Sequence, residues 1–248
     1  MDLAIPIVVE QNFIISGIIL LAAITQSLTG FGFALVAVSL LPSVISIKFV
    51  VPLVALVSTL SNGILWFYYR QLFNLKAVLP LTFAALIAMP FGITALHYLS
   101  EKFVLRSLGI LIIGYALYDF FNLALPKLAS PSWAYVFGFL SGLLTGAYNT
   151  GGPPVVVYGS CRRWQPETFK SNLPGFFLIN SIIAVVGHGI QGSLTPMVWT
   201  LALLAIPPFV VGLAIGIVWS KNLNPSAFKR VILVLLILTG LKLVLVQS

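Results

Sequence analysis

Charged residues are scarce in this sequence. Only 7% of the 248 residues are Asp, Glu, Lys or Arg, whereas 60% are apolar, and the mean hydropathy is +1.10. Long stretches contain no Asp, Glu, Lys or Arg at all, among them 11–47, 49–69 and 172–220. Because a typical soluble domain has about 25% charged residues, this composition excludes an ordinary soluble protein.

Residues that commonly catalyse reactions or bind metals are also few. The chain has one cysteine, Cys161, and two histidines, His97 and His188, which lie far apart in the sequence. A single cysteine cannot form an intrachain disulfide. The sequence also lacks a His-Glu-x-x-His motif and paired aspartates, so we expect no enzyme activity, no cofactor and no metal site.

Long apolar runs make up most of the sequence. A helix needs about 20 apolar residues to cross a bilayer, and runs such as 231–238 are apolar on every face, as expected of a helix in lipid. We predict an all-α integral membrane protein, with about eight transmembrane segments in a single membrane domain, 1–248. The predicted segments are 11–41, 49–69, 77–99, 103–123, 132–160, 168–190, 196–219 and 226–246.

The second half of the chain repeats the first. Leu28-Thr29-Gly30 recurs as Leu144-Thr145-Gly146, and from Gly32 onward a constant offset of 120 positions pairs equivalent residues, such as Gly32 with Gly152. We predict two internal repeats of four segments, repeat 1 over about 11–123 and repeat 2 over about 132–247. Four simple crossings per repeat would make the repeats parallel, whereas a re-entrant first segment would make them inverted. The sequence leaves both arrangements open.

Each repeat opens with a polar, glycine-rich interruption of an apolar run. The first break spans 25–34, and the second spans 143–154, where Gly151-Gly152 precedes Pro153 and Pro154. Proline lacks an N–H, and the residue before a proline disfavours helix, whereas proline suits the first turn of a new helix. We therefore expect the first segment of each repeat to be broken or re-entrant, with a helix restarting at Pro153.

The two breaks also predict where a substrate binds. Free N–H groups at the start of a half-helix, together with its positive dipole end, form a site for anions. The alternative is that these small residues only let helices pack closely in lipid. The predicted substrate-binding residues are Thr29, Gly30, Gly32, Thr145, Asn149, Thr150, Gly151, Gly152 and Pro153.

Further polar residues lie inside the apolar segments. Polar side chains at mid-membrane usually face the bundle interior, so we predict that they line the substrate path, with helix–helix hydrogen bonding as the alternative. The predicted path-lining residues are Gln26, Ser27, Asn62, Asn180 and Ser181. Asp119 and His188 are candidates for proton coupling, with a solvated position near a segment end as the alternative for each.

The basic residues are unevenly distributed between the loops. With eight crossings, nine Lys and Arg residues fall in the odd-numbered loops and four in the even-numbered ones. The positive-inside rule then places the odd loops in the cytoplasm and both termini outside. The net charge of +8 reflects these loop residues and forms no basic patch with interleaved aromatics, so nucleic acid is not an expected partner.

In order and spacing, these motifs resemble the sulfite exporter (TauE/SafE) family. The resemblance rests on 26–36 in the first half, on 142–146 and 151–154 in the second, and on the late-repeat elements 90–92 and 208–212. It covers almost the whole chain. It implies export of small sulfur-containing anions, such as sulfite or organosulfonates, across the bacterial inner membrane without an ATPase domain.

Taken with the repeats, the resemblance predicts a secondary transporter with alternating access about a site between the repeats. The alternatives are an anion channel and a transporter of a different small organic anion. The expected partners are the anionic substrate and the lipid bilayer. The sequence leaves open whether the chain also forms a homo-oligomer.

Overall fold

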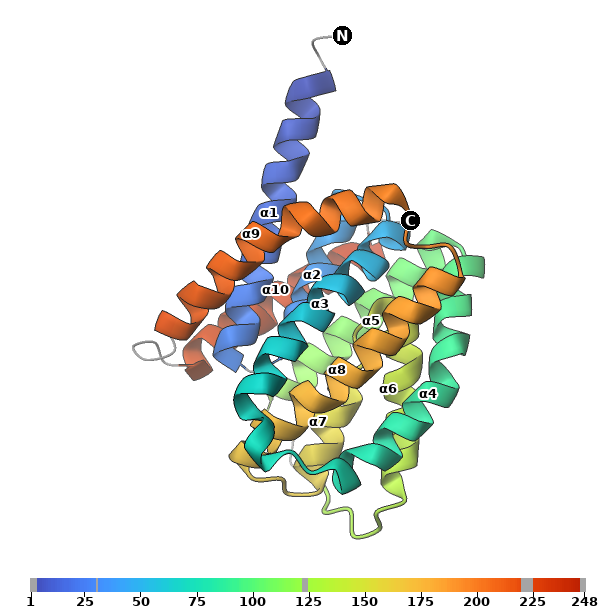
Figure 1. The fold of residues 1–248 in the computed structure, drawn as a ribbon, viewed down its shortest axis with the longest axis vertical. Helices are drawn as coiled ribbons and strands as arrows, with labels where there is room; N and C mark the ends of the chain where they lie inside the picture. Colours follow the sequence, from blue (N-terminus) through green and yellow to red (C-terminus); the bar gives the residue numbers. More distant parts are fainter. Residues whose placement is uncertain (1–3, 30, 122–124, 220–224, 246–248) are drawn as a thin grey trace.

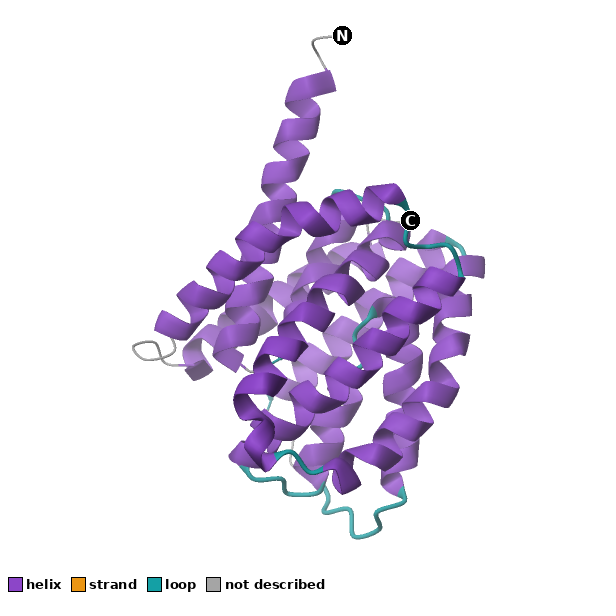
Figure 2. Ribbon diagram, in the orientation of Figure 1, coloured by secondary structure: helices purple, strands orange, loops and turns teal. Residues whose placement is uncertain are grey.

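A computed structural model describes residues 4–29, 31–121, 125–219 and 225–245, and helices account for most of them (Figures 1 and 2). No strand occurs among these residues, which confirms the all-α prediction. Two 3₁₀ turns, η1 (Leu41–Ser43) and η2 (Arg70–Leu72), accompany the α-helices. The α-helices are α1 (Ala4–Thr29), α2 (Phe33–Leu40), α3 (Ile47–Tyr69), α4 (Leu75–Tyr98), α5 (Glu101–Phe120), α6 (Trp133–Tyr148), α7 (Gly152–Cys161), α8 (Pro166–Ile190), α9 (Pro196–Trp219) and α10 (Pro225–Leu245).

The helix ends follow local sequence signals. Ser46, Asn74 and Ser100 precede α3, α4 and α5, and their side-chain oxygens accept hydrogen bonds from N–H groups in the first turn. Such caps satisfy donors that have no acceptor inside the helix. α8, α9 and α10 each begin at a proline, a position at which the missing N–H costs nothing.

Both predicted breaks are present. The segment 11–41 folds as α1 followed by α2, and the segment 132–160 folds as α6 followed by α7. Gly32 enters α2 with a φ of 104°, and Asn149 ends α6 with a φ of 54°. Both values lie in the left-handed region, which Gly adopts freely and Asn tolerates better than most residues. The predicted unwinding of the second segment is therefore confirmed.

The described helices do not confirm eight simple crossings. Six of the described helices are long and apolar enough to span a membrane, namely α1, α3, α4, α5, α8 and α9. α2, α6 and α7 have only 8, 16 and 10 residues, and a single crossing needs about 20.

α6 and α7 form a helical hairpin whose outer ends lie side by side. The Leu128 N–H, shortly before α6, donates to the Cys161 carbonyl at the end of α7 over 3.1 Å. Arg162 Nη1 donates to the carbonyls of Leu128 and Ala129 over 2.8 and 2.7 Å. The chain thus enters and leaves the hairpin at the same face of the helix bundle. We call this the basic face, because Lys127, Arg162, Arg163 and Lys170 lie at this end of the hairpin.

α1 and α2 form a matching hairpin at the other end of the bundle. α1 runs parallel to α9, because Leu20 lies against Gly212 and Ser27 against Gly216. The last turn of α2 shares a surface groove with Lys242 at the end of α10. In Figure 1, α1 enters from the upper side and α2 returns toward it, whereas the α6–α7 hairpin enters from the lower side. We call the upper side the opposite face.

The most extensive helix pairs each join the first half of the chain to the second. α4 runs parallel to α6: Gly138, Gly142 and Gly146, one every four residues, lie directly against the α4 backbone at 81–89. Small residues at this spacing let two membrane helices approach closely. The α1–α9 pair is also parallel.

Two other pairs run antiparallel. In the α5–α10 pair, Gly109 packs on Val244 and Ile113 packs on Gly240. In the α3–α8 pair, Gly63 faces Leu178, and beyond the C-terminal end of α3 the Asn74 N–H donates to Asn172 Oδ1 over 2.9 Å. Each of these two antiparallel pairs joins helices at equivalent positions in the two predicted repeats.

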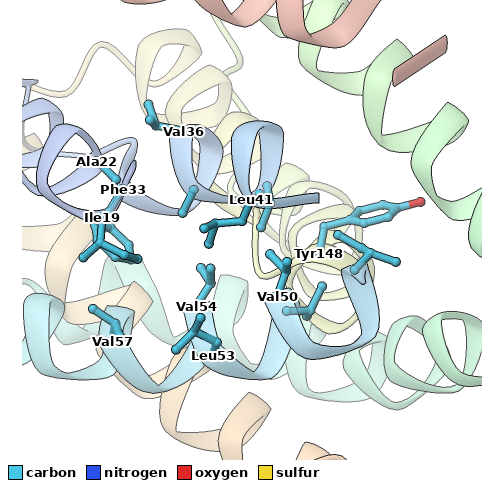
Figure 3. Packing of buried hydrophobic residues seen from close by; sticks show 14 of the residues in the cluster. Ile19, Ala22, Phe33, Val36, Leu41, Val50, Leu53, Val54, Val57 and Tyr148 are labelled. Carbon is cyan, nitrogen blue, oxygen red and sulfur yellow. The ribbon is translucent and has the colours of Figure 1, made fainter. Parts of the chain in front are cut away.

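The largest apolar core fills the space between α1, α2 and α3 (Figure 3). Ile19 of α1, Phe33 of α2 and Val54 of α3 are among its buried members. Many large apolar side chains, such as Phe91 and Ile190, are exposed on the outer surface instead. An outer surface of this kind suits contact with lipid tails, because polar groups are costly there.

Candidate functional site

A cavity lies where the two breaks meet. Its empty volume is about 510 Å³, and both halves of the chain line it. Ser58 and Asn180, which border it, lie near the midpoints of α3 and α8. The two breaks therefore share one cavity at mid-depth, as predicted. Its lining residues are Gln26, Phe31, Gly32, Phe33, Ala34, Leu35, Ser58, Asn62, Thr145, Asn149, Thr150, Gly151, Gly152, Phe177, Asn180 and Ser181.

Two amide side chains tie the breaks to α3. From the first half, Gln26 Nε2 donates to Asn62 Oδ1 over 3.2 Å. From the second, Asn149 Nδ2 donates to Ser58 Oγ over 3.2 Å. Ser58 and Asn62 are one helical turn apart, so they share one face of α3. The hydrogen bonds to that face therefore position both breaks at the cavity.

Further hydrogen bonds hold the second break against α6. Thr145 Oγ1 donates to the Ser141 carbonyl over 2.8 Å, and Ser141 Oγ donates to the Gly151 carbonyl over 2.6 Å. The Asn149 N–H donates to the Thr145 carbonyl over 2.8 Å. A Cβ at Gly151 would collide with the Thr145 and Ser141 side chains. The second break is therefore a hydrogen-bonded turn with no room for a side chain at position 151.

Three polar atoms at the cavity have no hydrogen-bond partner among the described residues: Gln26 Oε1, Thr150 Oγ1 and Asn180 Oδ1. Their residues are only 3%, 2% and 1% exposed. An unpartnered buried polar atom costs free energy, which a polar ligand in the cavity would recover. Gln26 Nε2 already donates to Asn62 Oδ1, and Asn180 Nδ2 donates to the Phe176 carbonyl over 2.8 Å, so the two amide oxygens are the acceptors left for such a ligand.

Two helices begin at the cavity. In α2, the first-turn residues 33–35 all line it, and the first N–H groups of a helix have no acceptor within that helix. In α7, Gly152 is followed by two prolines, which have no N–H. The first break therefore offers more backbone donors than the second, although the second has the stronger sequence signal.

The described residues that line the cavity include no charged side chain. Across the described parts of the chain, no three His, Cys, Asp or Glu residues lie close enough together to hold a metal ion. The potential in the cavity thus comes from neutral dipoles and from the two helix N-termini, each equivalent to at most about half a positive charge.

The sequence profile of the family described as "Sulfite exporter TauE/SafE" matches residues 15–243. This chain belongs to that family. The TauE/SafE proteins are membrane transporters, and this one is accordingly a multi-pass membrane protein. It is 26% identical over 231 residues to a protein of Cupriavidus necator named "Probable sulfite/organosulfonate exporter TauE", covering 89% of this chain and 88% of that protein. No solved structure matches the chain significantly.

Most residues predicted to form the site lie together in this TauE/SafE protein. Pro153 is buried in the first turn of α7, next to the cavity lining. Thr29 is the last residue of α1, and its side chain and Gly30 fall outside the described residues. The predicted residues that do line the cavity are Gln26, Gly32, Asn62, Thr145, Asn149, Thr150, Gly151, Gly152, Asn180 and Ser181.

Three predicted residues lie elsewhere. Ser27 Oγ donates to the Leu213 carbonyl of α9 over 3.3 Å and to the Ala23 carbonyl over 3.0 Å. Its hydroxyl is thus used in helix packing and not in lining the cavity. His188 is fully buried in α8 but does not line the cavity. It lies in the last turn of α8 and does not face solvent, so its burial counts against the solvated alternative and leaves that of a helix-capping histidine. Asp119 borders a second cavity.

That second cavity adjoins the first behind Phe31. It has an empty volume of about 320 Å³ and is lined mainly by apolar residues of α2, α5 and α10, together with Tyr115 and Asp119. Phe31 and Gly32 line both cavities. The Phe31 ring meets the Tyr115 ring edge-on, with ring centroids 6.2 Å apart. Phe31 is therefore part of the wall between the central cavity and the Asp119 carboxyl.

Sequence reasoning did not single out the aromatic walls of the central cavity. Phe31 and Phe33 flank Gly32, and Phe177 comes from α8. Phe177 precedes Asn180 and Ser181 by about one helical turn, a spacing that puts all three on one helix face. That spacing is the one signal in the sequence that could have indicated Phe177.

Proposed function

We propose that this TauE/SafE protein is a secondary transporter that exports sulfite or organosulfonates by alternating access about the central cavity. The observation that carries the proposal is the cavity, which both halves share and whose polar lining is neutral. The name of the relative from Cupriavidus necator, a probable sulfite/organosulfonate exporter, supports this substrate class.

The lining chemistry suits a small oxyanion. Such an anion needs several donors at once, and they are available from the first-turn N–H groups at 33–35, the Gly152 N–H and the Thr150 hydroxyl. Neutral donors bind an anion less tightly than a buried Lys or Arg would, so the substrate can leave again. The walls of Phe31, Phe33 and Phe177 would contact the carbon part of an organosulfonate.

We also propose that the halves are inverted repeats, each made of one hairpin and three further helices. The antiparallel pairs support this arrangement, because α3 and α8, like α5 and α10, hold equivalent places in the two repeats. Equivalent helices that meet antiparallel are related by a two-fold axis in the membrane plane. The same axis relates the α4–α6 pair to the α9–α1 pair, and both of these pairs are parallel.

The hairpins change which loops share a side of the membrane. The positive-inside rule then places the basic face in the cytoplasm and both termini outside the bacterial inner membrane. The proposed location of the termini is the same as with eight crossings, but the loops near Lys48, Arg70, Lys102 and Lys127 exchange sides. The basic face would hold Arg70, Lys76, Lys127, Arg162, Arg163, Lys170, Lys229 and Arg230, and the opposite face Lys48, Lys102, Arg106 and Lys242.

Alternating access would tilt the two halves against each other about the cavity. The hydrogen bonds from Gln26 and Asn149 to α3 bring both breaks to the same helix. A movement of α3 relative to α8 would therefore change both breaks together, and would open the cavity to one face while closing it to the other.

Counterflow in proteoliposomes tests the proposal. Vesicles loaded with unlabelled sulfite are diluted into radiolabelled sulfite, and a carrier should accumulate the label transiently and saturably. A flux that is linear in concentration and shows no transient accumulation would indicate an anion channel. Counterflow with simple carboxylates but with neither sulfite nor an organosulfonate would show that the substrate class is wrong.

A further inference from the structure

We infer that the central cavity selects singly charged oxyanions over doubly charged ones. It would take hydrogensulfite and not the sulfite dianion, and sulfonates and not sulfate. This inference rests on the proposed function and adds the charge state of the transported species.

The positive potential at the cavity is small. No charged side chain occurs among the described lining residues, so the formal positive contribution comes from the N-termini of α2 and α7. The N-terminus of α2 is equivalent to about half an elementary charge, and that of α7 to less, because two of its first-turn residues are prolines without an N–H. Together they match at most about one negative charge on the ligand. A dianion would keep at least about one uncompensated charge inside the bundle.

The side-chain atoms without a hydrogen-bond partner also favour a monoanion. Gln26 Oε1, Thr150 Oγ1 and Asn180 Oδ1 are oxygen atoms that carry acceptor lone pairs, and all three are buried at the cavity. The hydroxyl of an O-protonated oxyanion can donate to such an oxygen. A dianion has no proton to donate, and its larger charge is repelled more strongly by acceptor oxygens.

The apolar walls increase the discrimination. Phe31, Phe33 and Phe177 form a large part of the lining. Their rings have no hydrogen-bond donors to replace the water molecules that hydrate a dianion. The cost of removing an ion from water rises with the square of its charge. Fixed neutral donors that balance this cost for a monoanion therefore fall short for a dianion.

The described protein groups around the cavity are not expected to titrate at the site. None of the lining residues from α1, α2, α3, α6, α7 and α8 is titratable. Asp119 and Tyr115 line the adjoining cavity behind Phe31, where a carboxylate would repel a dianion further. Tyr148 pairs its hydroxyl with Ser107 over 2.6 Å. His188 and Tyr158, like Tyr148, do not line the central cavity. The expected pH dependence is therefore that of the substrate.

Counterflow by the unmodified protein, with equal pH on both sides of the membrane, tests the inference. The sulfite dianion binds one proton near neutral pH to become hydrogensulfite, whereas methanesulfonate is a monoanion at every pH used. At fixed total concentration, sulfite flux should fall about tenfold for each pH unit above that ionisation. Methanesulfonate flux should stay constant over the same range, and sulfate should not compete with either anion.

Three results would overturn the inference: sulfite flux that holds or rises with pH, sulfate that competes as well as methanesulfonate, and a parallel decline of both fluxes, which would indicate titration of the protein. Failure of the proposed function looks different, because then neither sulfite nor methanesulfonate would show counterflow at any pH.

Discussion

At the scale of single residues, two neighbouring glycines of the second break have different surroundings. A Cβ at Gly151 would collide with Thr145 and Ser141, whereas a Cβ at Gly152 would point into the cavity, 3.6 Å from Phe177 and 4.0 Å from Phe31. Gly152 also lies in α7 without a positive φ. The structure therefore leaves room for a Cβ at position 152.

We therefore expect Gly152→Val to fold normally and to lose sulfite transport, because its side chain would occupy the cavity. Gly151→Ala should instead lower the free energy of unfolding by about 1–3 kcal/mol through overpacking. Thermal unfolding and counterflow, measured on both variants, separate the two effects. Parent-like transport by a folded Gly152→Val would mean that the substrate does not pass this position.

Asn149 allows a charge test with almost no change of shape. Asn149→Asp is isosteric and would place a carboxylate beside the predicted anion site, so we expect transport to be abolished. Because φ at Asn149 is 54°, Asn149→Gly removes the side chain with less strain than Asn149→Ala. The glycine variant should weaken sulfite binding by about 1–3 kcal/mol, as measured by titration.

Asn74→Asp provides the matched control for Asn149→Asp. Asn74 Oδ1 caps α4 by accepting from the Ala77 N–H over 3.1 Å, a role that Asp fills equally well. It lies outside the cavity, so transport should be unchanged. Equal losses in the two aspartate variants would contradict a special role for position 149.

At the scale of helices, the sequence predicted both breaks because glycine and proline act on the backbone locally. It did not predict the return of the α6–α7 hairpin, because that return is fixed by contacts such as Arg162 with the Leu128 carbonyl, which are distant in sequence. For Ser27 the sequence predicted helix–helix hydrogen bonding only as the alternative to path lining, because its partner Leu213 lies on α9, in the other half of the chain.

The α4–α6 interface gives a prediction at this scale. A Cβ at Gly142 would collide with the Ala85 backbone, whereas a Cβ at Gly114 in α5 would meet nothing within 4 Å. Backbone cannot move aside as a side chain can, so Gly142→Ala should push α4 from α6 and cost about 1–3 kcal/mol of stability. Gly114→Ala should be neutral or stabilising by up to about 1 kcal/mol, through helix propensity. Equal melting temperatures of the two variants would mean that the glycine stripe does not set the helix spacing.

For the whole molecule, the hairpins decide the topology. If both segments 11–41 and 132–160 crossed the membrane once, Ser43 would lie inside and Gln71 outside, given outside termini. With two hairpins the assignment reverses: Ser43 lies outside and Gln71 in the cytoplasm. Both side chains are exposed, so cysteines at these positions can report the difference.

We expect Ser43→Cys to react with a membrane-impermeant maleimide in intact cells, and Gln71→Cys to react only after the cytoplasmic side is opened. The native Cys161 is buried and would be replaced by alanine in both variants, with counterflow as the check that they still fold. A basic face in the cytoplasm requires this result, because Arg70 and Lys76 flank Gln71 and lie on the same face as Arg162 and Arg163. Labelling of Gln71→Cys in intact cells, with protection of Ser43→Cys, would restore eight crossings and remove the basis for inverted repeats.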